Sequence, residues 1–307
     1  MKNYDSSHRP FEGFRSTIID TGAATIRVRY GGHGNPLLLL HGIPETHLMW
    51  HKIAPRLAQD FTVVATDLRG YGESAKPPST ADHAPYSKRA MAEDQVSVMR
   101  HLGFDRFFVA GHDRGARVAY RMALDHPERV RKLAVLDIVP TGEAFRRTDK
   151  EMAFGFWVWF FLAQPDGLPE RVIGNDPQFF LDHMLDAWST VPDAFPVEIR
   201  RAYLRNFSDP ETLHAICEEY RAAITLDYEM DEADRGTRRI ACPVLALWSS
   251  AGAVQHWYDA LAVWREWADD VRGTALDCGH FLPEEAPEET YAQLHAFFAD
   301  SFPLSLP

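Results

Sequence analysis

Cysteine is scarce in this chain of 307 residues. Cys217, Cys242 and Cys278 are far apart and show none of the paired spacings that bind zinc or build a disulfide framework. We therefore expect buried, reduced thiols. The chain also lacks an H-E-x-x-H sequence and a glycine loop that could cradle phosphates before a helix. No metal site and no organic cofactor are predicted.

An excess of positive charge and long apolar runs are also missing. The 44 acidic residues outnumber the 32 Lys and Arg residues, and the net charge of -12 gives no general attraction to nucleic acid or to an anionic membrane. The most apolar stretch, from Phe154, is about half of the roughly 20 residues that cross a bilayer, and we expect a buried or site-lining helix there. Residues 1–14 contain no apolar run with a cleavage site. These absences predict a cytoplasmic protein whose partner is a small molecule.

What the chain does contain is a regular alternation of strand-like and helical segments, with 46% hydrophobic residues available for a core. The alternation predicts an α/β fold with a mostly parallel sheet flanked by helices. The strand-like segments are residues 24–30, 36–42, 61–68, 106–113, 131–139 and 243–249. The helical segments are residues 88–102, 115–125, 255–267 and 287–299.

The alternation stops between Pro140 and about Gly236, where aromatic residues and prolines replace the strand pattern. We interpret residues 141–236 as a helical cap inserted into a core domain. That core domain would comprise residues 1–140 and 237–307.

A strand, a sharp turn and a helix are predicted at VAGHDRGARVAY, residues 109–120. Gly111 and Gly115 permit the turn that hydrolases use to raise a serine nucleophile above a sheet, but the central residue here is Asp113. A carboxylate suits displacement at a saturated carbon, because the ester that forms can then be hydrolysed. The alternative is that Asp113 only caps the helix.

Two other segments favour a catalytic role for Asp113. The turn HGIP at residues 41–44 follows a strand and would place the N–H of Ile43 beside the N–H of Arg114 as an oxyanion hole. His280 lies in a loop after the last strand-like segment, which is where hydrolases with this strand–turn–helix arrangement carry their catalytic histidine.

The acid that orients His280 is expected at Asp137. No carboxylate follows the strand at residues 243–249, whereas Asp137 ends a strongly apolar run. A charge in such a position is costly to bury, which favours a functional role. The alternative is a capping or ion-pairing role for Asp137 at the turn that contains Pro140.

Two arginines follow the proposed nucleophile. Arg114 and Arg117 are three residues apart at the start of a helix, so both can reach one face and bind a substrate carboxylate. They would also offset the repulsion between an anionic substrate and Asp113. The alternative, a solvent-exposed helix arginine, fits Arg121 better than the two arginines beside the turn.

These residues together resemble the haloacetate (fluoroacetate) dehalogenases of the α/β-hydrolase superfamily. The resemblance covers nearly the whole chain and rests on GHDRGARVAYRMALDHPERV, HGIP, LRGYGESAKP, LDIVPT and GHFLPEEAP, with WFFLAQP, CEEYRAA and DYEMD in the cap. H-D-R-G-x-R is much more discriminating than the hydrolase turn in general, since epoxide hydrolases and haloalkane dehalogenases usually carry H-D-W-G. The resemblance implies an α/β-hydrolase fold, hydrolysis of haloacetate to glycolate and halide, and a homodimer.

The resemblance also implies a halide site. Trp159 and Tyr220 match the family's halide-binding tryptophan and tyrosine, but the histidine that usually precedes the tryptophan is replaced by Val158. Because fluoride depends most on hydrogen-bond donors as it leaves, we predict that chloroacetate and bromoacetate are favoured over fluoroacetate.

Two other functions stay open from the sequence. An epoxide hydrolase would use the same triad with Tyr220 and Tyr203 as proton donors, although Arg114 argues against it unless the epoxide carries a carboxylate. A non-catalytic protein of this fold that only binds a small acid is the third possibility.

Overall fold

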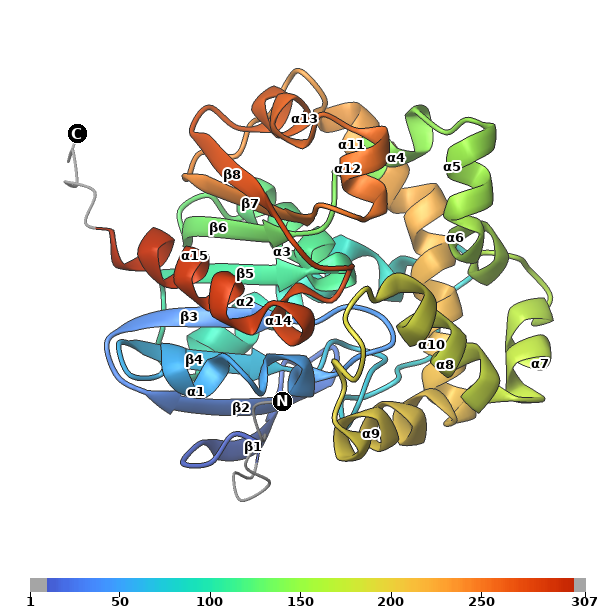
Figure 1. Cartoon of the computed structure of the whole chain (residues 1–307), viewed down its shortest axis with the longest axis horizontal. Coiled ribbons are helices and arrows are strands. Elements are labelled where there is room, and N and C mark those ends of the chain that lie inside the picture. The colour runs from blue at the N-terminus through green and yellow to red at the C-terminus, as the bar shows by residue number, and fades with distance from the viewer. Residues whose placement is uncertain (1–9, 301–307) are drawn as a thin grey trace.

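An eight-stranded sheet runs through the molecule in the computed structural model, which describes residues 10–300 (Figure 1). The strand order is β1-β2-β4-β3-β5-β6-β7-β8; β1 and β4 pair antiparallel with β2, and all other neighbours pair parallel. The strands are β1 Arg15–Asp20, β2 Thr25–Gly32, β3 Asn35–Leu40, β4 Phe61–Thr66, β5 Phe107–His112, β6 Val130–Leu136, β7 Val244–Ser249 and β8 Val271–Leu276. The predicted α/β fold with a mostly parallel sheet is confirmed.

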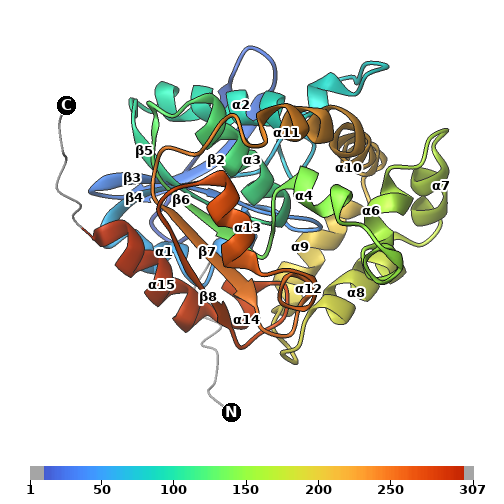
Figure 2. The ribbon, with the colours of Figure 1, turned by 90° about the horizontal axis from the view of Figure 1, so that it is seen from above.

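Helices around the sheet complete the core. They are α1 Ala54–Leu57, α2 Lys88–His101, α3 Asp113–Asp125, α12 Ala253–Trp257, α13 Ala260–Trp267, α14 Leu282–Glu285 and α15 Pro287–Ala299, with 3-10 turns η1 His47–Trp50 and η2 Ala84–Tyr86. In Figure 2, α2 and α3 cover one face of the sheet, while α1 and α15 cover the other.

The leucine run of β3 shows why both faces need this cover. Successive strand residues point to opposite faces, so Leu38 and Leu40 pack into the cluster under α2, α3 and α13. Leu37 and Leu39 pack into the cluster under α1, α14 and α15. A continuous apolar run therefore indicates a strand that is buried on both sides.

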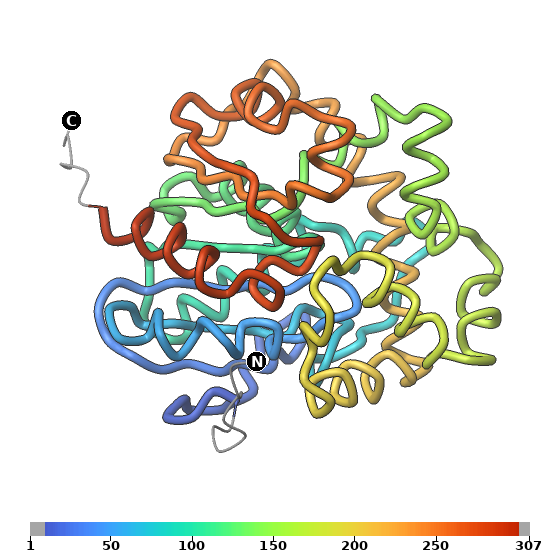
Figure 3. Tube along the Cα trace, viewed as in Figure 1, coloured from blue at the N-terminus to red at the C-terminus, as the bar shows by residue number. Residues whose placement is uncertain are grey.

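Between β6 and β7 the described chain forms no strand, apart from an isolated bridge at Ile240, and its regular elements are helices. They are α4 Thr141–Arg146, α5 Lys150–Gly155, α6 Trp157–Leu162, α7 Leu168–Gly174, α8 Pro177–Trp188, α9 Val197–Phe207, α10 Pro210–Ala222, the π-helical turn η3 Ala223–Asp227 and α11 Tyr228–Asp234. Figure 3 shows this green-to-gold part of the tube against one end of the sheet. We continue to treat residues 141–236 as a proposed cap domain.

Several sequence predictions were wrong in detail. The strands β1 and β8 were missed because they lie at the two edges of the sheet and are largely exposed, so they lack an apolar run. The helix expected at residues 255–267 is broken into α12 and α13, since the side chain of Asp259 caps a new helix by accepting the N–H of Ala262. The apolar stretch from Phe154 spans α5 and α6, and Phe154 itself is 85% exposed.

The start of the chain and the length of its apolar helices bear on two further expectations from the sequence. The N-terminal segment, residues 1–14, is described only from Pro10 onward, and its first nine residues lie outside the described part. No helix within residues 10–300 is long and apolar enough to span a membrane.

Candidate active site

Asp113 stands at the sharp turn between β5 and α3. It is the first residue of α3, and its φ of 42° lies in the left-handed region, which a non-glycine residue adopts at an energetic cost. The turn packs tightly against the end of β3, because a Cβ atom at Gly115 would lie 2.5 Å from the backbone oxygen of His41. This packing holds the Asp113 side chain above the carboxyl end of the sheet. The N–H of Ile43 donates to its Oδ2 at 3.3 Å.

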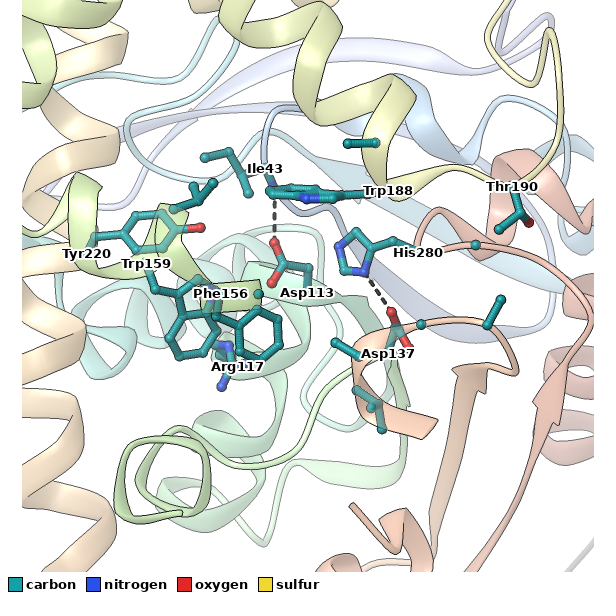
Figure 4. A pocket seen from close by; sticks show the side chains of 18 residues that line it. Ile43, Asp113, Arg117, Asp137, Phe156, Trp159, Trp188, Thr190, Tyr220 and His280 are labelled. Carbon is teal, nitrogen blue, oxygen red and sulfur yellow. Dashed lines mark hydrogen bonds and ion pairs between the residues drawn. The ribbon is translucent and has the colours of Figure 1, made fainter. Parts of the chain in front are cut away.

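His280 and Asp137 meet at the same edge of the sheet. Nδ1 of His280 lies 2.7 Å from Oδ2 of Asp137, and the other carboxylate oxygen of Asp137 accepts the N–H of Ser249 at 2.9 Å (Figure 4). Asp137 directly follows β6, and His280 follows β8, so parallel strands bring them together. Asp137 is therefore oriented from both of its oxygens.

A cavity of about 220 Å³ lies in front of these groups. Figure 4 shows Asp113 at its centre, with Tyr220 and Trp159 on one side and His280 on the other. The lining combines residues of the sheet loops with residues of the cap helices: Ile43, Asp113, Arg117, Asp137, Gly155, Phe156, Val158, Trp159, Ala187, Trp188, Thr190, Tyr220, Ala251, Gly252, Ala253, Val254, Gly279 and His280. All the predicted site residues except Arg114 line this cavity.

Arg114 lies behind the cavity wall. Its guanidinium carbon sits 4.0 Å from the ring centre of Tyr220, and its Nε donates to Oε1 of Glu219 at 2.9 Å. Both terminal nitrogens, Nη1 and Nη2, are buried without a hydrogen-bond partner among the described residues. A fully buried cation with unpaired donors is costly unless an anion satisfies them.

Arg117 reaches the cavity directly. Its Nη1 donates to the backbone oxygen of Val139 at 3.0 Å and to the hydroxyl of Thr141 at 3.1 Å. The guanidinium lies 4.3 Å from the ring centre of Trp159, and Nε has no partner within the described chain. Arg117 thus leaves one unpaired nitrogen at the cavity, while the two unpaired nitrogens of Arg114 lie behind its wall.

The surroundings of Asp113 favour its charged form. Burial alone would raise its pKa, but the electrostatic influence of His280 and Arg114 holds the pKa below its usual value. A carboxylate that stays ionised is the form that can attack carbon.

Arg121 is not the solvent-exposed helix arginine that the sequence allowed. Its side chain is buried, with Nη2 donating to Asp231 at 2.9 Å and Nη1 to Asp234 at 2.6 Å. It therefore joins α3 to α11, a structural role that only the folded arrangement reveals.

Tyr203, one of the two proton donors of the epoxide hydrolase hypothesis, lies away from the cavity. It is fully buried, its hydroxyl donates to Oε1 of Glu284 at 2.5 Å, and it is absent from the cavity lining. Tyr220 is the only one of that pair that lines the cavity.

The chain matches the family model of the α/β hydrolase fold over residues 35–287. It is 45% identical to a fluoroacetate dehalogenase from Burkholderia sp. over 292 residues, which cover 95% of this chain and 96% of that protein. It belongs to the haloacetate dehalogenase family of the α/β-hydrolase superfamily. Members of this family are hydrolases that act on carbon–halide bonds, and the chain is one of them.

Other relatives of the chain have related functions or the same fold. A soluble epoxide hydrolase from Corynebacterium sp. (strain C12) is 34% identical over 275 residues, covering 87% of this chain and 91% of that protein. A solved structure from Nostoc sp. PCC 7120, assigned to the α/β hydrolases, is 56% identical, with a TM-score of 0.93 and coverage of 95% of this chain and 100% of that one.

Sequence reasoning missed a buried charge network behind Arg114. Oε1 of Glu219 lies 2.6 Å from Nζ of Lys88, and Oε2 accepts the hydroxyl of Tyr71 at 2.5 Å. Burial opposes the charge on Glu219, but Arg114 and Lys88 lower its pKa to about 2. The only sequence signal was the position of Glu219 beside Tyr220. No described group of His, Cys, Asp and Glu side chains could hold a metal ion, and the described cysteines are buried and free.

Sequence reasoning also missed His112, the residue before the nucleophile. Its Nδ1 lies 3.1 Å from Oε2 of Glu45, and its Nε2 lies 2.8 Å from the backbone oxygen of His280. Burial would lower the pKa of His112, but the Glu45 carboxylate, together with Asp113 and the backbone oxygen of His280, raises the pKa to about 9. A protonated ring donates from both nitrogens and links the two catalytic loops.

This shift predicts a pH-dependent stability. Because the pKa of His112 is raised on folding, its protonation adds to the free energy of unfolding. This contribution is complete below about pH 6.5 and is lost as the pH rises through about 9. The free energy of unfolding should fall by an amount on the order of 3 kcal/mol over this range. We expect Glu45→Gln to flatten the decline in the free energy of unfolding between these pH values, measured by urea unfolding. The control is Glu128→Gln, since Glu128 is exposed on a turn. An unchanged slope in Glu45→Gln would contradict the assignment.

Proposed function

We propose that the protein is a hydrolytic dehalogenase of short 2-haloacids, which converts a haloacetate to glycolate and halide through an ester on Asp113. The proposed triad is Asp113, His280 and Asp137. The proposed partner is a small haloacid, with no metal or organic cofactor in the reaction, and a homodimer remains a prediction.

The observation that carries this proposal is the unpaired guanidinium nitrogen of Arg117, which lines the same cavity as Asp113. Nη1 and Nη2 of Arg114 and Nε of Arg117 are buried without partners among the described residues. A substrate carboxylate is the simplest group that would accept from such planar, charged donors. It would also bring the neighbouring halogenated carbon close to Asp113.

In the first half of the proposed reaction, Asp113 attacks the carbon that bears the halogen. The N–H of Ile43 is engaged with Oδ2, which leaves Oδ1 as the attacking atom. The new carbon–oxygen bond forms as the carbon–halogen bond breaks, and the halide leaves with the bonding electron pair. The product is an alkyl ester of Asp113.

In the second half, His280 takes a proton from water while Asp137 stabilises the imidazolium. The resulting hydroxide adds to the ester carbonyl, and the negative charge develops on Oδ2, where the N–H groups of Ile43 and Arg114 would stabilise it. When the tetrahedral intermediate collapses, glycolate leaves with the proton from His280. Asp113 is regenerated with one oxygen from solvent.

Trp159 and Tyr220 are the proposed halide donors. Their rings meet edge to face with centres 6.3 Å apart, and among the described residues neither the indole N–H nor the hydroxyl donates a hydrogen bond. Both line the cavity next to Asp113. A leaving halide would accept from both in a site shielded from bulk water.

Hydrolysis of a small or carboxylate-bearing epoxide is the second candidate, supported by the 34% identical soluble epoxide hydrolase. It is disfavoured because Tyr203 is bound to Glu284 outside the cavity. Assays of halide release from chloroacetate and of diol formation from glycidate and from propylene oxide distinguish the two. Faster turnover of either epoxide would overturn the dehalogenase proposal, and binding of chloroacetate without turnover would favour a non-catalytic protein.

The position of Val158 predicts the order of substrates. Val158 is 2% exposed and lines the cavity beside Trp159, where a histidine would add a third donor for the halide. One hydrogen bond to a charged group is worth roughly 1.5–3 kcal/mol, and fluoride depends on it most. We therefore expect chloroacetate and bromoacetate to be processed faster than fluoroacetate.

The substitution Val158→His tests this expectation. It should raise the ratio of fluoride to chloride release by about 10-fold or more, measured from steady-state rates on the separate acids. Val158→Leu is the matched control, since it fills space without adding a donor. Efficient fluoride release by the wild type that Val158→His leaves unchanged would refute the donor argument.

A further inference from the structure

The carboxylate of Glu285 binds two segments that are distant in the chain. Its Oε2 accepts the N–H of Thr190 at 2.8 Å and the N–H of Val191 at 3.2 Å, although Thr190 lies 95 residues earlier. The same oxygen accepts the N–H of Gly279 at 2.9 Å, and Oε1 accepts the N–H of Phe281 at 2.9 Å. Glu285 is only 9% exposed, so water competes little for these bonds.

These hydrogen bonds surround His280. The N–H groups of Gly279 and Phe281 donate to Glu285, while the N–H of His280 itself donates to the backbone oxygen of Trp188 at 2.8 Å. Three consecutive backbone N–H groups, those of residues 279–281, are thus fixed at this junction. The loop of the proposed base is tied to the same segment that Glu285 holds.

The side chain of Trp188 adds a contact to the proposed base. Its ring meets the ring of His280 edge to face, with the ring centres 5.6 Å apart. Figure 4 shows Trp188 over His280, with Thr190 beyond it. Residues 188–191 therefore contact both the backbone and the imidazole of His280.

Gly279 shows how closely the junction is packed. A Cβ atom at this position would lie 2.5 Å from the backbone oxygen of Trp188, 2.7 Å from the nitrogen of Thr190 and 2.8 Å from Oε1 of Glu285. Both segments and the carboxylate therefore converge on one point, where only glycine fits. Trp188 and Thr190 also line the cavity, so the junction sets part of the cavity wall as well as the His280 loop.

We propose that Glu285 is a positioning residue, which fixes the His280 loop against residues 188–191 and so sets the rate of ester hydrolysis. The inference rests on the proposed function, because His280 acts on water only in the second half of that reaction. A base must be held within about 0.5 Å of its productive position, and the Glu285 bonds supply that restraint. A glutamine at this position would have one accepting oxygen in place of two. Its NH₂ group would face backbone N–H groups, from which it cannot accept a hydrogen bond.

The test is Glu285→Gln, studied in single turnover with chloroacetate. We expect hydrolysis of the Asp113 ester to slow by about 100-fold while formation of the ester keeps its wild-type rate, so that mass spectrometry detects the ester accumulating. Backbone amides of residues 190–191 and 279–281 should lose protection from hydrogen exchange together. Glu288→Gln is the control, since the Glu288 side chain is 73% exposed on α15. Should Glu285→Gln fail to fold, Glu285→Asp keeps the charge but shortens the side chain, so that it cannot reach all four N–H groups, and it should slow the same step.

The outcomes separate this inference from the proposed function. If His280→Asn accumulates the ester but a folded Glu285→Gln does not, the positioning role is overturned and the proposed function stands. If His280→Asn accumulates no ester, the proposed function fails together with the role of Glu285 in ester hydrolysis, and the exchange experiment tests only the link between the two segments. Joint loss of protection at the two segments would then support a structural link through Glu285, and unchanged protection would overturn it.

Discussion

Replacing His280 by Asn is expected to stop the reaction after its first half and to leave Asp113 as a carboxymethyl ester. In the proposed reaction His280 acts only on water, and loss of a general base slows a step by about 10²–10⁴-fold. After addition of chloroacetate, mass spectrometry of the digested protein should detect the added group on the peptide that contains Asp113. Halide release should show one fast equivalent and then almost cease.

Two further variants make this result interpretable. Asp113→Asn should give no adduct and no immediate halide release, because the proposed nucleophile is missing. His214→Asn is the matched control, since its side chain is 56% exposed on the cap helix α10 and lies outside the cavity lining. An adduct on another residue in His280→Asn would contradict the proposed nucleophile.

Replacing Arg117 by Met is expected to lower kcat/KM for chloroacetate by roughly 30-fold to several thousand-fold, which corresponds to about 2–5 kcal/mol for loss of a buried charged partner. The physical reason is that Arg117 lines the cavity and holds an unpaired Nε near Asp113. Arg114→Met should act in the same direction, because both terminal nitrogens of Arg114 are buried and unpaired among the described residues.

The neutral substrate chloroacetamide separates carboxylate recognition from a general defect. The wild type should process it poorly, and Arg117→Met should change its rate much less than the rate with chloroacetate. Arg100→Met, on the exposed side of α2, is the control. Equal losses for the acid and the amide in Arg117→Met would contradict the role of Arg117 in carboxylate binding.

The fold and the core of the candidate site could be read from the sequence because both follow local rules. Buried strands such as β3 and β5 carry continuous apolar runs, and Asp113 and Asp137 directly follow strand ends. Since parallel strands end at one edge, residues at those positions meet in space. The edge strands β1 and β8 have no such run and were missed.

The supporting contacts could not be predicted in this way. Glu219 reaches Arg114 across 105 residues, and Glu285 reaches Thr190 across 95 residues, so their partners depend on how the cap packs on the sheet. Arg121 was misplaced for the same reason, because its partners Asp231 and Asp234 come from α11. The sequence near each of these residues does not indicate which distant residue it contacts.

In the proposed reaction Asp113 forms an ester that water attacks at the carbonyl carbon of Asp113. A single turnover in H₂¹⁸O, with the wild-type protein in excess over chloroacetate, tests it most directly. The account predicts glycolate without the label and one ¹⁸O atom in the carboxylate of Asp113, found by mass spectrometry of the peptide. Labelled glycolate from the first turnover, with an unlabelled Asp113, would show that water displaces the halide directly and would contradict the account.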